Sequence, residues 1–128
     1  MHITGLYTAL AALLVLVLSV RVVLARRRHK VVLGDGGEKE LMKCIRAQAN
    51  AVEYLPLALL LLLSLEWNQT QPAIVHACGI VLIVARVIHG IGLSETGGMS
   101  SGRFFGTALT WIVMLVMALL LIWEQVVR

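Results

Sequence analysis

Four long apolar runs constrain what this chain can fold into more than any other feature of its sequence. A helix that crosses a bilayer needs roughly 20 mainly apolar residues, and the runs lie near residues 3–24, 38–66, 73–93 and 104–123. Only 14% of the residues are charged and the mean hydropathy is +0.90, which excludes a soluble domain with a charged surface. The sequence therefore predicts an all-α integral membrane protein, in which residues 1–128 form a single bundle of four transmembrane helices in the lipid bilayer.

Basic residues are distributed unevenly between the ends of these runs. Six of them lie around the connection between the first two runs, before the apolar part of the second: Arg26, Arg27, Arg28, Lys30, Lys39 and Lys43. Because no basic residue precedes the first run, it is predicted to be a retained helix and not a signal peptide. Cytoplasmic loops carry the excess of Lys and Arg, so residues 25–44 are predicted to be cytoplasmic and both termini to lie on the opposite side. The net charge of +4 is therefore attributed to basic residues that orient the protein in the membrane, and no nucleic-acid partner is expected.

Aromatic residues give a second indication of the same topology. Tyr7, Trp67 and Trp123 all lie near the ends of runs that this topology places on the far side. Amphipathic rings favour the interface between membrane and water. We therefore expect all three rings near the far interface.

The second run carries polar residues that must enter the membrane, because its purely apolar part, residues 55–65, is too short to cross alone. At about 100° per residue, Asn50 lies about 40° and Glu53 about 340° around the helix from Arg46, so the three share one narrow face. Charged side chains within a bilayer are costly and usually functional. Two interpretations remain. The three residues form a binding site inside the membrane, or Arg46 extends to the membrane interface and pairs with Glu53.

Arg86 and His89 lie three residues apart on the third run and face one side, where they could complete the same site. The charge of Arg86 requires compensation, and Glu53 is the acidic residue that lies well within a run. His89 is equally well explained as a hydrogen-bonded packing residue, and for His76 packing is the preferred interpretation. Arg103, ahead of the fourth run, is expected at the depth of Arg26 and Arg46, and such a set of guanidinium groups suits an anionic ligand.

The two cysteines, Cys44 and Cys78, have neither a CxxC spacing nor the pattern of a disulfide framework. They are interpreted as two unpaired thiols. No metal site is expected.

The string RAQANAVEYLP, from Arg46 to Pro56, closely resembles the helix-two signature of the membrane-associated proteins in eicosanoid and glutathione metabolism, the MAPEG family, RAxxNxxEYxP in outline. The resemblance extends over the whole chain. It includes an ARR triplet at the end of helix one, a GDGG loop as in bacterial members, and an arginine before helix four. An AR pair, Ala85 and Arg86, with a histidine three residues later on helix three, completes it.

The resemblance implies a homotrimer of four-helix subunits in the bacterial inner membrane, with glutathione as co-substrate bound between neighbouring subunits towards the cytoplasm. The positions carried over as glutathione ligands are Arg26, Arg46, Gln48, Asn50, Glu53 and Tyr54, with Arg86 and His89 completing the site. The glutamate would meet the ammonium group of the ligand and the arginines its carboxylates. Arg103 is implied as the catalytic residue that activates the thiol. Gln48 lies about 160° from Asn50 around the helix, so its contact would be indirect or need a distorted helix.

Two positions depart from the family pattern. Ala49 replaces a second arginine of prostaglandin-synthesising members, and Leu93 replaces a tyrosine that several eukaryotic members carry on helix three. Arg103 also lies at a slightly different spacing from His89. Glutathione binding depends less on these positions than any particular reaction does.

Three functions follow as hypotheses. The first is a membrane glutathione transferase or peroxidase that acts on lipophilic electrophiles or hydroperoxides entering from the bilayer. The alternative is a non-catalytic lipid-binding or scaffold protein of the same family, which the departures at Ala49 and Leu93 favour. A small multidrug transporter is disfavoured, because in that class the intramembrane glutamate lies in the first helix and the charge bias between loops is weak.

Overall fold

A computed structural model describes residues 2–95 and 100–127, apart from the side chains of residues 93–95. The chain forms four helices: α1 (His2–His29), α2 (Lys39–Trp67), α3 (Pro72–Glu95) and α4 (Ser101–Val127). Each contains a segment long and apolar enough to cross a membrane. No strand occurs among the described residues. The predicted all-α membrane bundle is confirmed.

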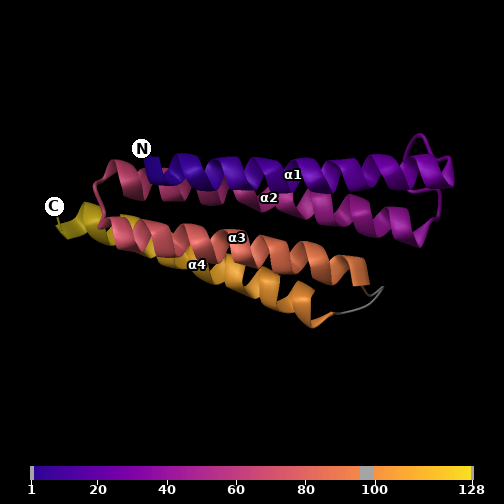
Figure 1. Cartoon of the computed structure of the whole chain (residues 1–128). Coiled ribbons are helices and arrows are strands. Elements are labelled where there is room, and N and C mark those ends of the chain that lie inside the picture. Colours follow the sequence, from indigo (N-terminus) through magenta and orange to yellow (C-terminus); the bar gives the residue numbers. More distant parts are fainter. Residues whose placement is uncertain (1, 96–99, 128) are drawn as a thin grey trace.

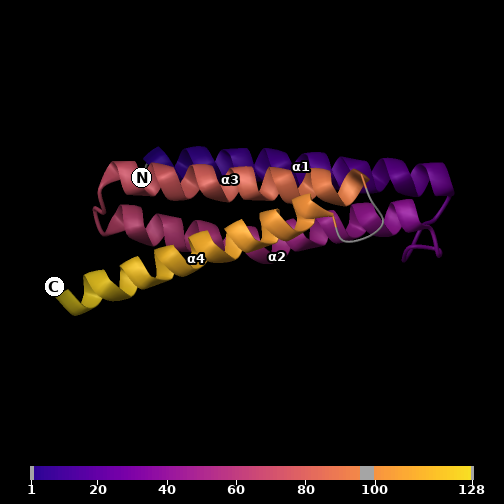
Figure 2. The same cartoon turned by 90° about the horizontal axis from the view of Figure 1, so that it is seen from below.

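The helices run antiparallel in chain order and lie side by side (Figure 1). Both termini and the α2–α3 connection lie at one end of the bundle. The α1–α2 connection lies at the other end, where this hairpin extends beyond α3 and α4. A view from below shows that the C-terminal part of α4 leans away from α1 and α3 (Figure 2). The end that carries the α1–α2 connection is called the basic end below.

Two helices are longer than the apolar runs predict. α1 continues through Arg26, Arg27 and Arg28 to His29, because no residue that breaks a helix interrupts it before Lys30, whose φ of 55° is left-handed. Its 28 residues span about 42 Å, against about 30 Å for a hydrocarbon core. The last turns of α1 can therefore stand in the headgroup region. α4 begins at Ser101, so Arg103 belongs to its first turn and does not precede the helix.

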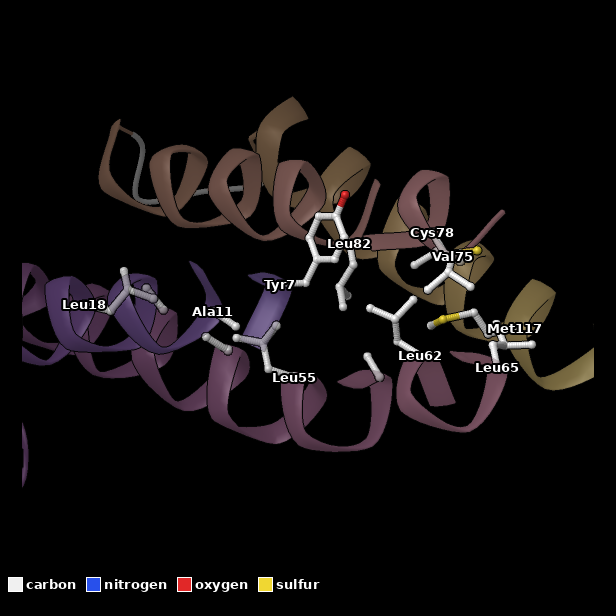
Figure 3. Packing of buried hydrophobic residues seen from close by; sticks show 14 residues of the cluster. Tyr7, Ala11, Leu18, Leu55, Leu62, Leu65, Val75, Cys78, Leu82 and Met117 are labelled. Atoms are coloured by element: carbon white, nitrogen blue, oxygen red, sulfur yellow. The ribbon is translucent and has the colours of Figure 1, made fainter. Parts of the chain in front are cut away.

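The hydrophobic core joins all four helices near the middle of the bundle (Figure 3). Tyr7, Leu62, Leu82 and Met117 are among its buried members, one from each helix. The Tyr7 ring rests on Gly79, where an added Cβ would lie 2.3–2.6 Å from ring carbons. The fold thus requires a glycine at position 79.

Tyr7 differs from the two tryptophans in its burial. It is only 4% exposed, whereas Trp67 and Trp123 are 71% and 65% exposed. Its hydroxyl donates to the His76 carbonyl oxygen at 3.1 Å and lies 3.0 Å from His76 Nδ1. Tyr7 can be a core residue because this partner satisfies its hydroxyl inside the bundle, and the contact fits the packing interpretation of His76.

Two carboxylates secure the end of the bundle that holds the termini. Glu66 accepts hydrogen bonds from the backbone N–H groups of Ile3 and Thr4, at 3.1 and 2.8 Å. An acidic group is favourable at a helix N-terminus, where N–H groups lack partners within the helix. Glu124 of α4 accepts from Asn68 Nδ2 at 3.0 Å and from Thr70 Oγ1. These bonds tie α1 to α2 and α4 to the α2–α3 connection.

Candidate functional site

The polar stripe of α2 lies at the edge of the bundle. The buried residues Ala47, Ala51 and Leu55 are centred about 140° around the helix from Arg46. Arg46 and Glu53 are accordingly exposed, whereas Asn50 and Tyr54, which lie between these two faces, are partly buried. One side of the stripe therefore faces the bundle and the other faces outwards.

Arg86 links the inner side of this stripe to two other helices. It is 2% exposed, and its Nη1 donates to Asn50 Oδ1 of α2 at 2.6 Å. Its Nη2 donates to the Gly106 carbonyl oxygen of α4 at 3.0 Å, and its Cζ lies 5.5 Å from the centre of the Tyr54 ring. One guanidinium group thus connects α2, α3 and α4, although its Nε has no hydrogen-bond partner among the described residues.

Neither expected partner of Glu53 contacts it. Among the residues that the structure describes, Arg86 bonds to an amide and a carbonyl oxygen and not to Glu53. Arg46 and Glu53 also form no ion pair there. The two residues are seven positions apart, which separates their backbone positions by about 10 Å along a helix. Within one described chain, both outward charges of the stripe lack a partner.

A glycine seam holds α3 against α4 beside Arg86. A Cβ added at Gly106 would lie 2.7 Å from the Ala85 carbonyl oxygen and 2.8 Å from the His89 Cα. A Cβ added at Gly92 would lie 2.8 Å from the Arg103 nitrogen. His89 is 5% exposed at this seam. The two backbones approach so closely that side chains at these glycines would separate the helices.

Ser100 fixes the beginning of α4. Its hydroxyl donates to the Gly92 carbonyl oxygen at 2.8 Å and accepts from the Arg103 backbone N–H at 3.2 Å. The second bond is a typical N-cap interaction. The backbone of Arg103 is therefore tied to α3, while its side chain is exposed and makes no hydrogen bond or ion pair with the described part of the chain.

The remaining predicted ligands lie away from this cluster. Arg26 donates from Nη1 to the Gly34 carbonyl oxygen at 2.7 Å, in the α1–α2 connection. Gln48 is partly buried and lies about 160° around α2 from Arg46. The structure thus brings together Asn50, Tyr54, Arg86 and His89, but it does not bring Arg26 or Gln48 to the face of Arg46 and Glu53.

Sequence reasoning missed two interactions near the start of α4: the Gly106 backbone carbonyl oxygen that accepts from Arg86, and the Ser100 hydroxyl that caps the helix. The sequence signal for them was the density of small residues between positions 100 and 106, which was interpreted as a loop. Ala49 is partly buried next to the stripe. The side chain of Leu93 lies outside the described part of the structure.

No group of three metal-ligating side chains occurs in the described ranges. Cys44 and Cys78 are both buried and unpaired.

Comparisons with known proteins identify the family of this chain. A family model for the MAPEG family matches residues 4–123. The chain is 40% identical to the inner membrane protein YecN of Escherichia coli strain K12 over 121 aligned residues. The aligned region covers 94% of this chain and 91% of that protein. The protein of the same name from an Escherichia coli O6:H1 strain is similar to the same extent. With its four apolar helices and the RAQANAVEYLP segment of α2, this chain belongs to the MAPEG family.

Proposed function

We propose that this protein binds glutathione in the bacterial inner membrane, as a homotrimer, and uses it as a transferase or peroxidase on lipophilic electrophiles or hydroperoxides. Membership of the family supports glutathione as the co-substrate. The name of the Escherichia coli relative supports the inner membrane. In this proposal, residues 25–44 face the cytoplasm and both termini the other side, as the excess of basic residues favours.

The observation that carries the proposal is the exposed pair Arg46 and Glu53 on a helix long and apolar enough to cross the membrane. Each charged group costs on the order of 2.5–3.5 kcal/mol near the centre of a bilayer on the mildest scale. Neither has a partner within the described chain. A ligand that carries both carboxylates and an ammonium group compensates both charges at once, and glutathione is such a ligand.

The outward direction of this pair supports a site between two copies of the chain. Arg26 and Gln48 do not reach the face of Arg46 and Glu53 in their own chain. In a ring of subunits, one face of each chain contacts a different face of the next chain. Arg26 and Gln48 of one chain can therefore meet Arg46 and Glu53 of its neighbour. We assign Arg26 and Gln48 to the neighbouring chain at each site.

The roles of the residues follow from their charges and burial. Glu53 accepts from the ligand ammonium, and Arg46 with the neighbour's Arg26 binds the carboxylates through planar donor pairs. Asn50 and Tyr54 offer neutral hydrogen-bonding groups beside them. Because Arg86 and His89 are almost completely buried, they act through the residues they hold: Arg86 orients the Asn50 amide, and His89 supports the seam that positions α4.

Arg103 is assigned to the reacting thiol. A free thiol has a pKa of about 8.5 and reacts as the thiolate, and a nearby guanidinium or a helix N-terminus stabilises that anion. Arg103 supplies the guanidinium from the first turn of α4, so both effects act at one place. The thiolate then forms a carbon–sulfur bond with the electrophile as the leaving group departs with the bonding electrons. With a hydroperoxide, the thiolate attacks the terminal peroxide oxygen, so that an S–O bond forms as the O–O bond breaks and the alkoxide leaves as the alcohol once protonated. A second glutathione then reduces the resulting sulfenic acid, which gives glutathione disulfide and water.

A titration of the purified protein with glutathione tests this assignment. Replacing Glu53 by glutamine keeps the shape of the side chain but removes the charge that pairs with the ligand ammonium. We expect the affinity to fall by about 10-fold or more, as for the loss of a charged hydrogen bond. The matched control is Glu38→Gln, which removes an exposed carboxylate at the basic end and should leave the affinity unchanged. Equal affinity of Glu53→Gln and the unmodified protein would refute the assignment.

One observation favours the alternative, a non-catalytic lipid-binding member of the family. An open apolar groove between α1 and α2 is lined by residues that include Gly5, Pro56 and Leu60, and Ala49 offers no second guanidinium at the site. This alternative predicts binding of a lipophilic ligand without turnover of a chloronitrobenzene or lipid hydroperoxide in the presence of glutathione. A measurable rate that depends on Arg103 would exclude it.

A further inference from the structure

A polar cavity lies at the basic end, between the last turns of α1 and the first turns of α2. Its volume is about 220 Å³. Three basic residues, Arg21, Arg28 and Lys43, line it together with one acidic residue, Glu40. Its remaining lining is small or apolar, from Leu24, Ala25 and Cys44. This cavity, called the basic groove below, shares no residue with the proposed glutathione site.

The charges of the basic groove favour an anion. Arg28 Nη1 lies 2.6 Å from Glu40 Oε1, but the two side chains are 67% and 48% exposed. Ion pairs as exposed as this one contribute little energy, so Arg28 can exchange its carboxylate partner for another anion. Lys43 and Arg21 add two further positive charges to the lining. Guanidinium and ammonium groups of this kind bind phosphate oxygens through charge-assisted hydrogen bonds.

An apolar stripe continues from the groove along α1. Leu24, which lines the groove, is followed towards the centre of the helix by Val20, Val17 and Leu13 at intervals of three or four residues, which places them on one side of the helix. These side chains are 54%, 55%, 58% and 60% exposed in that order. A basic cavity in the headgroup region directly above such a stripe matches a phosphate group with a hydrocarbon chain below it. A free phosphate would use only the upper half of this arrangement.

The lining of the groove includes none of the proposed glutathione ligands. Arg26 lies about 160° around α1 from Arg28, and its guanidinium is bonded to Gly34. Arg46 and Glu53 do not line the groove. Occupation of the groove therefore needs no residue of the proposed active site, and the inference below does not rest on the proposed function.

We propose that the basic groove binds the phosphate of an anionic phospholipid, with one acyl chain along Leu24, Val20, Val17 and Leu13. Basic pockets between transmembrane helices at the cytoplasmic side are suited to such headgroups. The groove thus gives one lipid class a defined position against the α1–α2 hairpin.

Binding of short-chain lipids to the purified full-length protein in neutral detergent tests this proposal. The probes are dioctanoyl phosphatidylglycerol, dioctanoyl phosphatidylcholine and inorganic phosphate, and native mass spectrometry with a thermal-shift titration gives the affinity for each. Phosphatidylglycerol should bind more tightly than the other two. Equal binding of phosphatidylcholine would show that the anionic charge is not recognised, and equal binding of inorganic phosphate would show that the apolar stripe is not used. Either result overturns the proposal.

Three variants are expected to change phosphatidylglycerol binding in three different ways. Lys43→Gln should weaken phosphatidylglycerol binding by about five-fold, the usual effect of one basic residue near an anionic lipid. Glu40→Gln should strengthen it, because this change removes the acidic group of the lining. Arg27→Gln removes the same charge as Lys43→Gln from an exposed residue outside the lining and should have no effect. Equal losses for Lys43→Gln and Arg27→Gln would show diffuse attraction only, and no gain for Glu40→Gln would contradict the groove.

Measuring glutathione affinity on the same variants distinguishes a failure of the lipid proposal from a failure of the proposed function. Lys43→Gln should leave that affinity unchanged, whereas Glu53→Gln should lower it without altering phosphatidylglycerol binding. Loss of both ligands in Lys43→Gln would indicate a single shared site and would overturn the separation of the two.

Discussion

Replacing Arg103 by alanine is expected to slow the glutathione-dependent reaction by about 30-fold at pH 7, because a thiol with a pKa of about 8.5 is only about 3% ionised there, whereas an activated thiol is largely ionised. The measurement is the initial rate with a chloronitrobenzene at saturating glutathione. The deficit should shrink as the pH rises through 8.5, since the unassisted thiol then ionises by itself. Arg103→Lys, which keeps the charge, should retain much of the rate at pH 7.

The same variant separates catalysis from binding. Arg103 is assigned to the thiol and not to the carboxylates, so Arg103→Ala should lose glutathione affinity only to the extent that the bound thiol is ionised, and this loss should disappear at low pH, where glutathione binds as the neutral thiol. A rate equal to that of the unmodified protein at pH 7, or a deficit that stays constant up to pH 9, would show that Arg103 does not act on thiol ionisation.

Replacing Gly106 by alanine is expected to destabilise the bundle by about 1–3 kcal/mol, the usual range for inserting a methyl group into a tightly packed interface. The added Cβ would meet backbone atoms of α3 at 2.7–2.8 Å, and backbone cannot rotate away. Separation of α3 and α4 would also displace the carbonyl oxygen that Arg86 binds. The midpoint of thermal unfolding in detergent measures this effect, and glutathione affinity should decrease with it.

Gly5 provides a matched control for this prediction. It lies within α1, and a Cβ added there meets no heavy atom within 4 Å. Gly5→Ala should leave stability unchanged or raise it slightly, because alanine is a better helix former than glycine. Equal unfolding midpoints for Gly5→Ala and Gly106→Ala would show that the glycine seam is looser than the structure indicates.

The sequence was sufficient to predict the four helices, because the length and spacing of apolar runs depend only on local composition. The expected second helix, residues 38–66, differs by one residue at each end from α2 (Lys39–Trp67). α1 and α4 were predicted too short, because arginines, serines and glycines were taken as helix ends. At the basic end these residues continue the helix: Arg26 to Arg28 lie in its last turns, and Ser100 caps the first turn of α4.

The candidate site was predictable only in part. Helical periodicity correctly placed Arg46, Asn50 and Glu53 close together around α2, but it could not show which way the helix is turned. That direction depends on packing against α1, α3 and α4, and it separates Asn50, which meets Arg86, from the outward Arg46 and Glu53. The bond from Arg86 to the Gly106 carbonyl oxygen also depends on the packing of two helices. Because the acceptor is a backbone atom, no residue type in the sequence indicates this bond.

The most direct test of the central claim, that the glutathione site is completed by a neighbouring chain, is a mixing experiment with two defective variants. Arg26→Gln and Glu53→Gln are each expected to bind glutathione weakly when expressed alone. When they are expressed together and purified through two different tags, some subunit interfaces combine an intact Arg26 from one chain with an intact Glu53 from the next. These mixed assemblies are expected to regain a fraction of sites with full affinity, while the double variant Arg26→Gln/Glu53→Gln, co-expressed with itself, should regain none. Mixed assemblies that bind no better than either variant alone would contradict the central claim.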